Sequence, residues 1–149
     1  MKKSTQELMP EVGRLIREGK TVVLPVRGNS MRPFIQNGND CVELHPLPPV
    51  LRKGDVVLAR TSKGYYVLHR VTVISPDLLT LEGDGNISLR ETCRPSDVLA
   101  RAEWVIDAHK ERHSLLLLCK HGCIHLVHHN HNLSLLIKMV IMLKLILNV

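Results

Sequence analysis

The chain has 149 residues, 44% of them hydrophobic, which is enough for one folded domain with a buried core. Only 3% are aromatic, so Val, Leu and Ile have to supply most of that core. All 14 acidic residues lie within the first 111 positions, so the formal charge of +6 is unevenly placed. The first 111 residues are close to neutral, and we predict no nucleic-acid partner, since such binding needs a basic surface.

The N-terminal residues predict one amphipathic helix over residues 6–19. Ser4 or Thr5 can cap its first turn, and Gly19 can end it. Two lysines precede this helix without an apolar segment behind them, so we predict no secretory signal. The four cysteines follow no regular spacing, which favours reduced thiols and a cytoplasmic protein.

Short β-type segments separated by turn residues occupy the chain from residue 21 to residue 108. Their composition and close spacing are typical of an all-β sandwich or a partly open barrel. We therefore predict a mainly β fold, an antiparallel domain with the N-terminal helix packed beside it. The predicted strands are residues 21–26, 41–44, 56–60, 65–74, 78–81, 98–100 and 104–108, and the proline-rich stretch 45–50 is an extended loop.

The composition changes abruptly after residue 111, which predicts a folded domain over residues 1–111 and an extension over residues 112–149. The extension begins with a His- and Cys-rich stretch. Its Cys119 and Cys123, with the surrounding histidines, single out no set of four zinc ligands, so we predict no metal and no other cofactor.

An apolar run over residues 133–147 ends the extension. It is shorter than the roughly 20 residues of a membrane-spanning helix. A C-terminal helix that covers the sheet, peripheral contact with a membrane surface, and an unstructured end are three interpretations of this run. An out-of-frame extension would have the same composition.

A serine between turn residues and a histidine on a predicted strand are a candidate nucleophile and a candidate base. Gly28 allows a tight turn, so the Ser30 hydroxyl can project while its own N–H helps to bind an oxyanion. A serine hydroxyl is a weak nucleophile, and His69 is suited to activate it because its pKa lies near neutrality. Alternation puts His69 on the apolar face of the segment 65–74, which fits a site residue and a packed core histidine equally.

Asp84, within the Gly-Asp-Gly-Asn segment 83–86, can supply the acid that orients His69 and stabilises its protonated ring. The same segment is an ideal turn sequence, so a structural role for Asp84 is the alternative. Arg70 lies on the opposite face from His69, and we predict that it is solvated or ion-paired.

These segments resemble the signal peptidase I and self-cleaving repressor superfamily of serine peptidases. The resemblance extends from about residue 22 to residue 101, and it depends on the order and spacing of five short motifs. The motifs are residues 28–33 (GNSMRP), 38–42 (GNDCV), 53–57 (KGDVV), 67–71 (VLHRV) and 83–86 (GDGN).

The resemblance implies that Ser30 is the nucleophile and that Gly28 and Asn29 support the turn and the oxyanion. Bacterial members carry a lysine base where this chain has His69. That histidine is similar to the one in the serine–histidine branch of archaeal, endoplasmic-reticulum and sporulation-type signal peptidases, and Asp84 maps onto the acid of their Gly-Asp-x-Asn segment. Some members have a second acid a few residues later, which Glu91 matches only loosely.

Two classes of function follow from these residues. The first is a serine endopeptidase of the signal peptidase and repressor type, which cleaves a peptide or preprotein bound as an extended chain. The second is a non-catalytic peptide-binding or regulatory module on the same fold, which captures an extended peptide by strand addition. We predict a cytoplasmic protein in either case, with residues 133–147 as the segment for any peripheral membrane contact.

Overall fold

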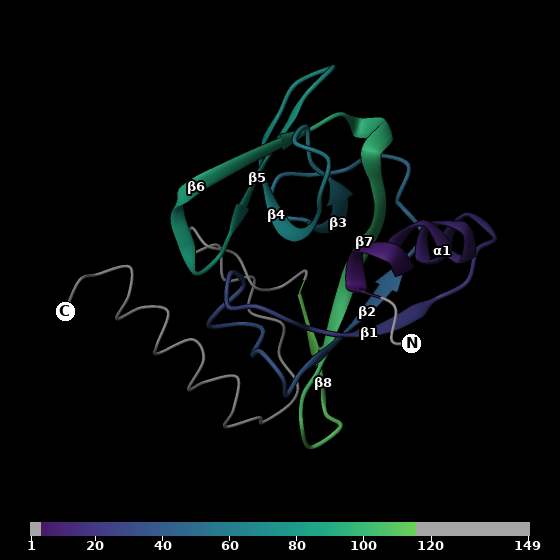
Figure 1. Cartoon of the computed structure of the whole chain (residues 1–149), viewed down its shortest axis with the longest axis vertical. Helices are drawn as coiled ribbons and strands as arrows, with labels where there is room; N and C mark the ends of the chain where they lie inside the picture. The colour runs from purple at the N-terminus through teal and green to yellow at the C-terminus, as the bar shows by residue number, and fades with distance from the viewer. Residues whose placement is uncertain (1–3, 116–149) are drawn as a thin grey trace.

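A computed structural model describes residues 4–115 as one α-helix and an antiparallel β-sheet (Figure 1). The predicted mainly β fold with one N-terminal helix is confirmed. The predicted helix within residues 133–147 and all of the His- and Cys-rich stretch from residue 116 onward lie outside the described residues. The strands are β1 (Val22–Pro25), β2 (Cys41–His45), β3 (Val56–Arg60), β4 (Tyr66–Ile74), β5 (Leu79–Gly83), β6 (Asn86–Cys93), β7 (Val98–Ile106) and β8 (Arg112–Ser114).

The helix α1 (Thr5–Arg17) begins at a capping box. The Ser4 hydroxyl accepts a hydrogen bond from the Glu7 N–H at 3.3 Å, and the Glu7 carboxylate accepts one from the Ser4 N–H at 2.7 Å. Ser4 is therefore the cap. After the helix, Gly19 adopts a positive φ of 83°, the conformation that commonly ends a helix.

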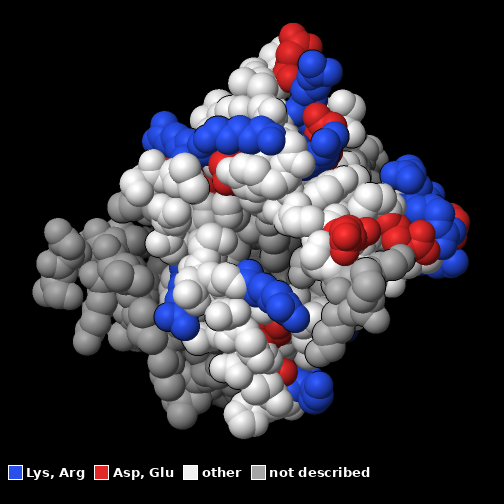
Figure 2. Space-filling model, viewed as in Figure 1, with Lys and Arg blue, Asp and Glu red and all other residues white. Residues whose placement is uncertain are grey.

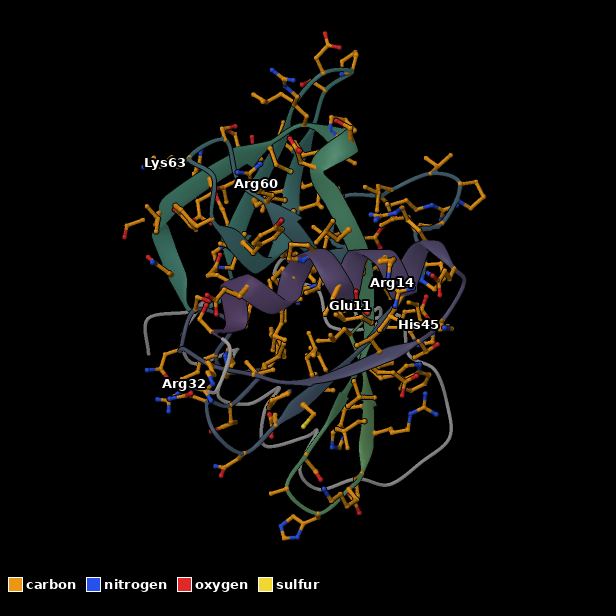
Figure 3. The ribbon with its side chains drawn as sticks, turned by 45° about the vertical axis from the view of Figure 1, so that its right-hand side comes forward. Glu11, Arg14, Arg32, His45, Arg60 and Lys63 are labelled. Carbon is orange, nitrogen blue, oxygen red and sulfur yellow. The ribbon has the colours of Figure 1, made fainter. Side chains whose placement is uncertain are left out.

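One face of α1 packs against the sheet through Met9, Val12 and Ile16, which are all buried. Its solvent face carries an ion pair between Glu11 and Arg14 (Figure 3). Among the described residues there is no helix long and apolar enough to cross a membrane.

The strands follow the order β1-β2-β7-β3-β4-β5-β6, and β8 pairs with β7 beyond the end of β3. Two strands differ from the prediction: β6 was not predicted, and β7 is one strand where two were predicted. The residues between those two predicted strands include Ala102, which is completely buried and pairs with β2 and β3 on either side. A central strand with neighbours on both edges is continuous even where its sequence is charged, because both neighbours supply hydrogen bonds.

The sheet is buried on both faces along β3, and two hydrophobic clusters lie on either side of it. Val56 and Leu58 join a cluster that α1 covers, whereas Val57 and Ala59 join a second cluster formed with β4, β5 and β6. The turn after β3 returns to β6, because the Ser62 N–H donates to the backbone oxygen of Thr92 at 2.7 Å. The β3–β6 part of the sheet therefore curls around the second cluster (Figure 1).

The sheet continues past the domain boundary predicted at residue 111. The strand β8 pairs with β7, and Leu115 behind it is only 1% exposed. The Leu115 N–H also donates to the backbone oxygen of Glu103 at 2.9 Å. The folded unit therefore reaches at least Leu115, because the hairpin of β7 and β8 closes the first cluster after the acidic residues have ended.

We predict that Leu115→Ala lowers the free energy of unfolding by about 2–5 kcal/mol, the usual cost of truncating a buried leucine. Leu89→Ala is the matched control, because Leu89 is 43% exposed on β6 and its loss should change stability little. Urea unfolding of both variants measures the difference. Equal stability of the two would show that β8 and Leu115 lie outside the cooperative unit.

Candidate functional site

The turn that carries Ser30 (residues 28–35, the Ser30 turn) connects β1 and β2, and its apolar side chains anchor it in the first hydrophobic cluster. Met31, Phe34 and Ile35 are buried in the first cluster. The N–H groups of Phe34 and Ile35 both donate to the backbone oxygen of Met31 at 3.1 Å. Ser30 itself is half-buried. An accessible hydroxyl is thus mounted on a packed support, as a nucleophile requires.

The glycine and asparagine before Ser30 have different surroundings. Gly28 has a positive φ of 91°, which a residue with a side chain rarely adopts, and its N–H donates to the Asn37 side chain at 3.1 Å. The Gly28 N–H therefore already has a hydrogen-bond partner, so Gly28 contributes to the turn and not to oxyanion binding. Asn29 is exposed, and its backbone oxygen accepts from the Arg32 N–H at 3.2 Å. Arg32 points outward (Figure 3). The N–H of Ser30 stays the candidate oxyanion donor.

The end of β5 passes directly against Ser30. A Cβ atom added at Gly83 would lie 2.4 Å from the Ser30 backbone oxygen and 2.9 Å from Ser30 Cβ. Two residues later, the Gly85 N–H donates to the same Ser30 oxygen at 2.8 Å. A side chain at position 83 would therefore displace Ser30, which explains the glycine at this point.

The register of the sheet directs His69 to the face that Ser30 occupies. Arg70 pairs with Glu82, so one residue further His69 lies opposite Gly83. Directly opposed residues project to the same face of a sheet, and Ser30 occupies the face to which a Gly83 side chain would point. Ser30 and His69 therefore share one face. No hydrogen bond joins Ser30 Oγ to the His69 ring in the described part of the chain, and such bonds are often long in free enzymes.

The acid beside the ring is Glu91. Its Oε2 lies 2.8 Å from His69 Nδ1, and the two side chains are 5% and 8% exposed. The ring N–H does not point along that line, so the contact is an ion-pair geometry without an aligned hydrogen bond. The other oxygen, Oε1, accepts from the Tyr65 hydroxyl at 2.5 Å. Glu91 pairs with Leu81 of β5. Leu81 and Gly83 face the same side of β5, and Gly83 has no side chain to separate the Glu91 carboxylate from the His69 ring.

Asp84 forms a buried ion pair with Arg70. Arg70 Nε and Nη2 donate to the two carboxylate oxygens at 2.8 and 2.7 Å, and the side chains are 3% and 1% exposed. The third nitrogen, Nη1, donates to the backbone oxygen of Gly54 at 2.7 Å. The guanidinium also lies over the ring of Phe34, 5.7 Å from its centroid. Arg70 is thus ion-paired rather than solvated.

Alternation along β4 explains why Asp84 does not contact the histidine. His69 and Arg70 project to opposite faces of β4, and Asp84, in the turn that follows β5, binds Arg70. The structure corrects the predicted contact: Asp84 binds Arg70, and Glu91, which the motifs indicated only loosely, lies beside His69. The alternation of Leu89, Glu91 and Cys93 was the signal in the sequence that could have identified β6 and its inward-facing acid.

Burial lowers the pKa of His69 below its ordinary value of 6.5, although Glu91 and, less strongly, Asp84 act in the opposite direction. The ring is therefore neutral at pH 7, the form that can accept a proton. The unfolded chain binds this proton more readily than the folded chain does. The contribution of His69 to stability is thus complete above about pH 6.5 and is lost as the pH falls through the folded pKa.

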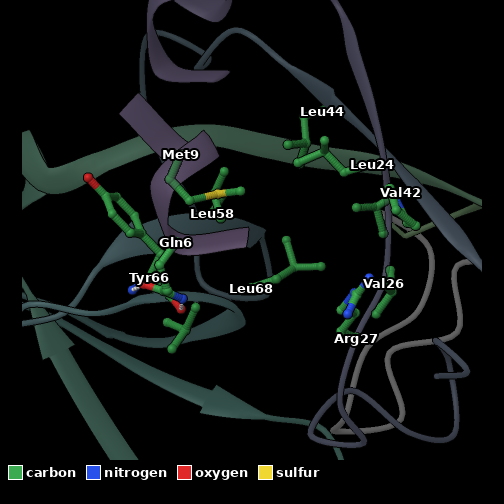
Figure 4. Close-up of a pocket in the computed structure, with 12 residues that line it drawn as sticks. Gln6, Met9, Leu24, Val26, Arg27, Val42, Leu44, Leu58, Tyr66 and Leu68 are labelled. Carbon is green, nitrogen blue, oxygen red and sulfur yellow. Dashed lines mark hydrogen bonds between the residues drawn. The ribbon is translucent and has the colours of Figure 1, made fainter. Parts of the chain in front are cut away.

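A pocket of about 230 Å³ lies between β1 and β4, next to these residues (Figure 4). Its walls are mainly apolar, with Gln6 at one side and Arg27 at the other. Arg27 is three residues before Ser30, and Leu68 directly precedes His69, so the pocket is near the site along both chain segments. Ser30 and His69 do not line it, and Leu68 and His69 project to opposite faces of β4. The lining residues are Gln6, Met9, Leu24, Pro25, Val26, Arg27, Val42, Leu44, Leu58, Tyr66, Val67 and Leu68.

One group of side chains in the described region has donor atoms close enough to hold a metal ion. Asp107, Glu111 and His113 offer ligand atoms within 4.8 Å of one another. The Asp107 carboxylate, however, already accepts from the N–H groups of His109 and Glu111 and bonds His113 Nε2 at 2.8 Å. This cluster holds the hairpin of β7 and β8 together.

Charged residues are dispersed on the face shown in Figure 2. Lys and Arg form separate small groups there, interrupted by Asp and Glu and by a larger uncharged surface. This face therefore has no continuous basic stripe of the kind that follows a nucleic-acid backbone.

No protein-family model matches the chain, and neither a curated protein nor a solved structure matches it. The likeness to signal peptidases therefore stays a prediction from the five motifs.

We predict that Glu91→Gln lowers the pKa of His69 further, because the nearest stabilising negative charge is removed. Asp84→Asn should lower it less, since that carboxylate acts from the other face. NMR titration of the His69 ring, identified by the signal that His69→Gln lacks, measures both shifts. A larger effect of Asp84→Asn would return the orienting role to Asp84.

We also predict that Asp84→Asn lowers the free energy of unfolding by about 3–5 kcal/mol, because Arg70 would stay buried without its partner. Lys20→Gln is the control, because Lys20 and Glu18 are 59% and 41% exposed in their ion pair and such pairs contribute about 0–1 kcal/mol. Denaturant unfolding compares them. Similar small losses would mean that the Arg70–Asp84 pair behaves as a surface pair.

Proposed function

We propose that this chain is a serine endopeptidase in which Ser30 is the nucleophile and His69 the general base. The observation that carries the proposal is the buried contact of His69 with Glu91, 2.8 Å from Nδ1. It is supported by the Ser30 turn, which packs on Gly83, the residue that the sheet register sets opposite His69. The Glu91 carboxylate near Nδ1 leaves Nε2 as the proposed proton acceptor for the Ser30 hydroxyl, the division of roles that serine hydrolases of several folds share.

The proposed reaction has two stages. Ser30 Oγ attacks the carbonyl carbon of a peptide bond while its proton passes to His69 Nε2, and the Ser30 N–H binds the resulting oxyanion. The bond to nitrogen then breaks, and the amine product leaves with the proton from His69. Water attacks the acyl-enzyme with His69 again as base, which releases the acid product and restores Ser30.

Glu91 and Tyr65 are proposed as positioning residues behind the base. The carboxylate stabilises the imidazolium that forms during each stage, and the Tyr65 hydroxyl holds its second oxygen at 2.5 Å. Asp84 acts indirectly, because its ion pair with Arg70 fixes the turn after β5, whose Gly85 N–H donates to the Ser30 backbone oxygen.

Serine rather than cysteine chemistry is favoured by the surroundings of Cys93. Burial raises the pKa of this thiol to about 11, so it is protonated and a poor nucleophile at neutral pH.

The proposed substrate is an extended peptide or preprotein segment. The apolar pocket between β1 and β4 offers room for its side chains beside Ser30, and its β4 wall offers main-chain groups for strand pairing. The resemblance to signal peptidases agrees with this substrate class. The second candidate is a peptide-binding module without turnover, which is favoured by the absence of a Ser30–His69 hydrogen bond in the described chain.

A fluorophosphonate probe tests the proposed nucleophile, because it labels only activated serines. The wild type should be labelled and Ser30→Ala should not. In His69→Gln the labelling rate should fall by several orders of magnitude, up to about 10⁶, since nucleophile and base act as one unit. Ser88→Ala, which removes an exposed serine of β6, is the control and should be labelled like the wild type.

Labelling of Ser30→Ala at the wild-type rate would exclude Ser30 as the nucleophile. A wild type that binds extended peptides but takes up no probe would favour the binding module instead.

A further inference from the structure

The side-chain amide of Gln6 pairs with both main-chain groups of Tyr66. Gln6 Oε1 accepts from the Tyr66 N–H at 2.9 Å, and Gln6 Nε2 donates to the Tyr66 backbone oxygen at 3.3 Å. An amide that accepts and donates in this way satisfies the same two groups as a residue of a neighbouring strand. Gln6 therefore takes the place of a strand partner at the start of β4.

The edge of β4 that Gln6 occupies is the edge facing the pocket. Odd-numbered residues of this segment bond towards β3, as the Thr61 N–H to Tyr65 oxygen bond of 2.8 Å shows. Even-numbered residues therefore direct their N–H and C=O groups to the opposite edge. There β5 begins to pair only at Arg70, so Tyr66 and Leu68 both present their groups towards the pocket.

We propose that Gln6 is a specificity-determining residue that limits how far an extended peptide can pair along β4. The inference rests on the proposed peptide substrate. A peptide with its reacting bond at Ser30 would pair first with Leu68, next to His69, and then with Tyr66, two residues further along. Gln6 already holds Tyr66, so strand pairing ends within about two or three residues of the reacting bond.

Gln6 is held in this position by the helix that carries it. The Ser4–Glu7 capping box fixes the first turn of α1, and Met9 on the next turn is buried against the pocket. A peptide that reaches Tyr66 must exchange two hydrogen bonds to Gln6 for two of its own and gains little. With a smaller residue at position 6, the same peptide residues would gain those bonds outright, an increase in affinity of about tenfold.

A matched pair of boronic acids, acetyl-Ala-boroAla and its pentapeptide counterpart of the same composition, tests the inference on the full chain. Both add reversibly to an activated serine, and their affinities are read from competition with fluorophosphonate labelling. In the wild type the longer compound should bind about as well as the shorter one. In Gln6→Ala the longer compound should gain about tenfold while the shorter one is unchanged. Glu11→Gln, on the solvent face of α1, should behave like the wild type.

Equal gains with length in the wild type and Gln6→Ala would overturn the inference, and so would equal losses for both compounds in a variant that unfolds like the wild type. Gln6→Glu is the second variant if Gln6→Ala fails to fold. It keeps the acceptor for the Tyr66 N–H but not the donor, and a length gain indistinguishable from the wild type would count against the proposal.

The experiment separates this inference from the proposed function. If the fluorophosphonate labels Ser30 and neither boronate competes with it in any variant, pairing along β4 is refuted and Ser30 is still supported as the nucleophile. Absence of labelling would refute the peptidase. The inference would then be decided by adding acetyl-hexa-alanine amide to the wild type and to Gln6→Ala and following the Tyr66 amide signal by NMR. This signal should shift more in Gln6→Ala than in the wild type. An equal shift in the two proteins, or no shift in either, would overturn the inference.

Discussion

The buried ion pair between Arg70 and Asp84 joins more of the chain than any other contact around the site. Removing both charges from water is costly, and such a pair is stable only when nearly every donor has a partner. Here the guanidinium reaches Asp84, the backbone of Gly54 and the ring of Phe34. These partners belong to the turn after β5, the turn before β3 and the Ser30 turn. The relative positions of the three turns therefore depend on one side chain of β4.

The alternation of a β-strand separates the Arg70–Asp84 ion pair from the candidate catalytic residues. His69 and Arg70 are adjacent in sequence but project to opposite faces of β4, and each meets a carboxylate on its own face. A shift of one residue in register would exchange the two environments, exposing a neutral ring to Asp84 and a guanidinium to Glu91. The close contact of Gly83 with Ser30 opposes such a shift, because the residues on either side of Gly83 carry side chains.

Local patterns in the sequence were sufficient for α1, for most of the strands before β6 and for the turn that carries Ser30. The Ser4 cap, the helix and the strand β3 are determined by neighbouring residues, and these were predicted closely. The acid beside His69 was not, because the choice between Asp84 and Glu91 depends on which strands pair and in what register. Pairing between distant segments is also what makes β7 continuous and adds β8 after the composition changes. The Gly-Asp-Gly-Asn motif favoured Asp84 as the acid beside His69, whereas the pairing of the strands places Glu91 there.

The first turn of α1, which the capping box closes, carries the Gln6 contact to the edge of β4. The first turn of a helix opens and closes within about a microsecond, whereas enzymes commonly turn over about ten times per second. In the proposed peptidase, opening of the turn around Ser4 would thus reach equilibrium many thousands of times during one catalytic cycle. So fast a step would change the concentration at which a long peptide saturates the protein, and it would leave the maximal rate unchanged.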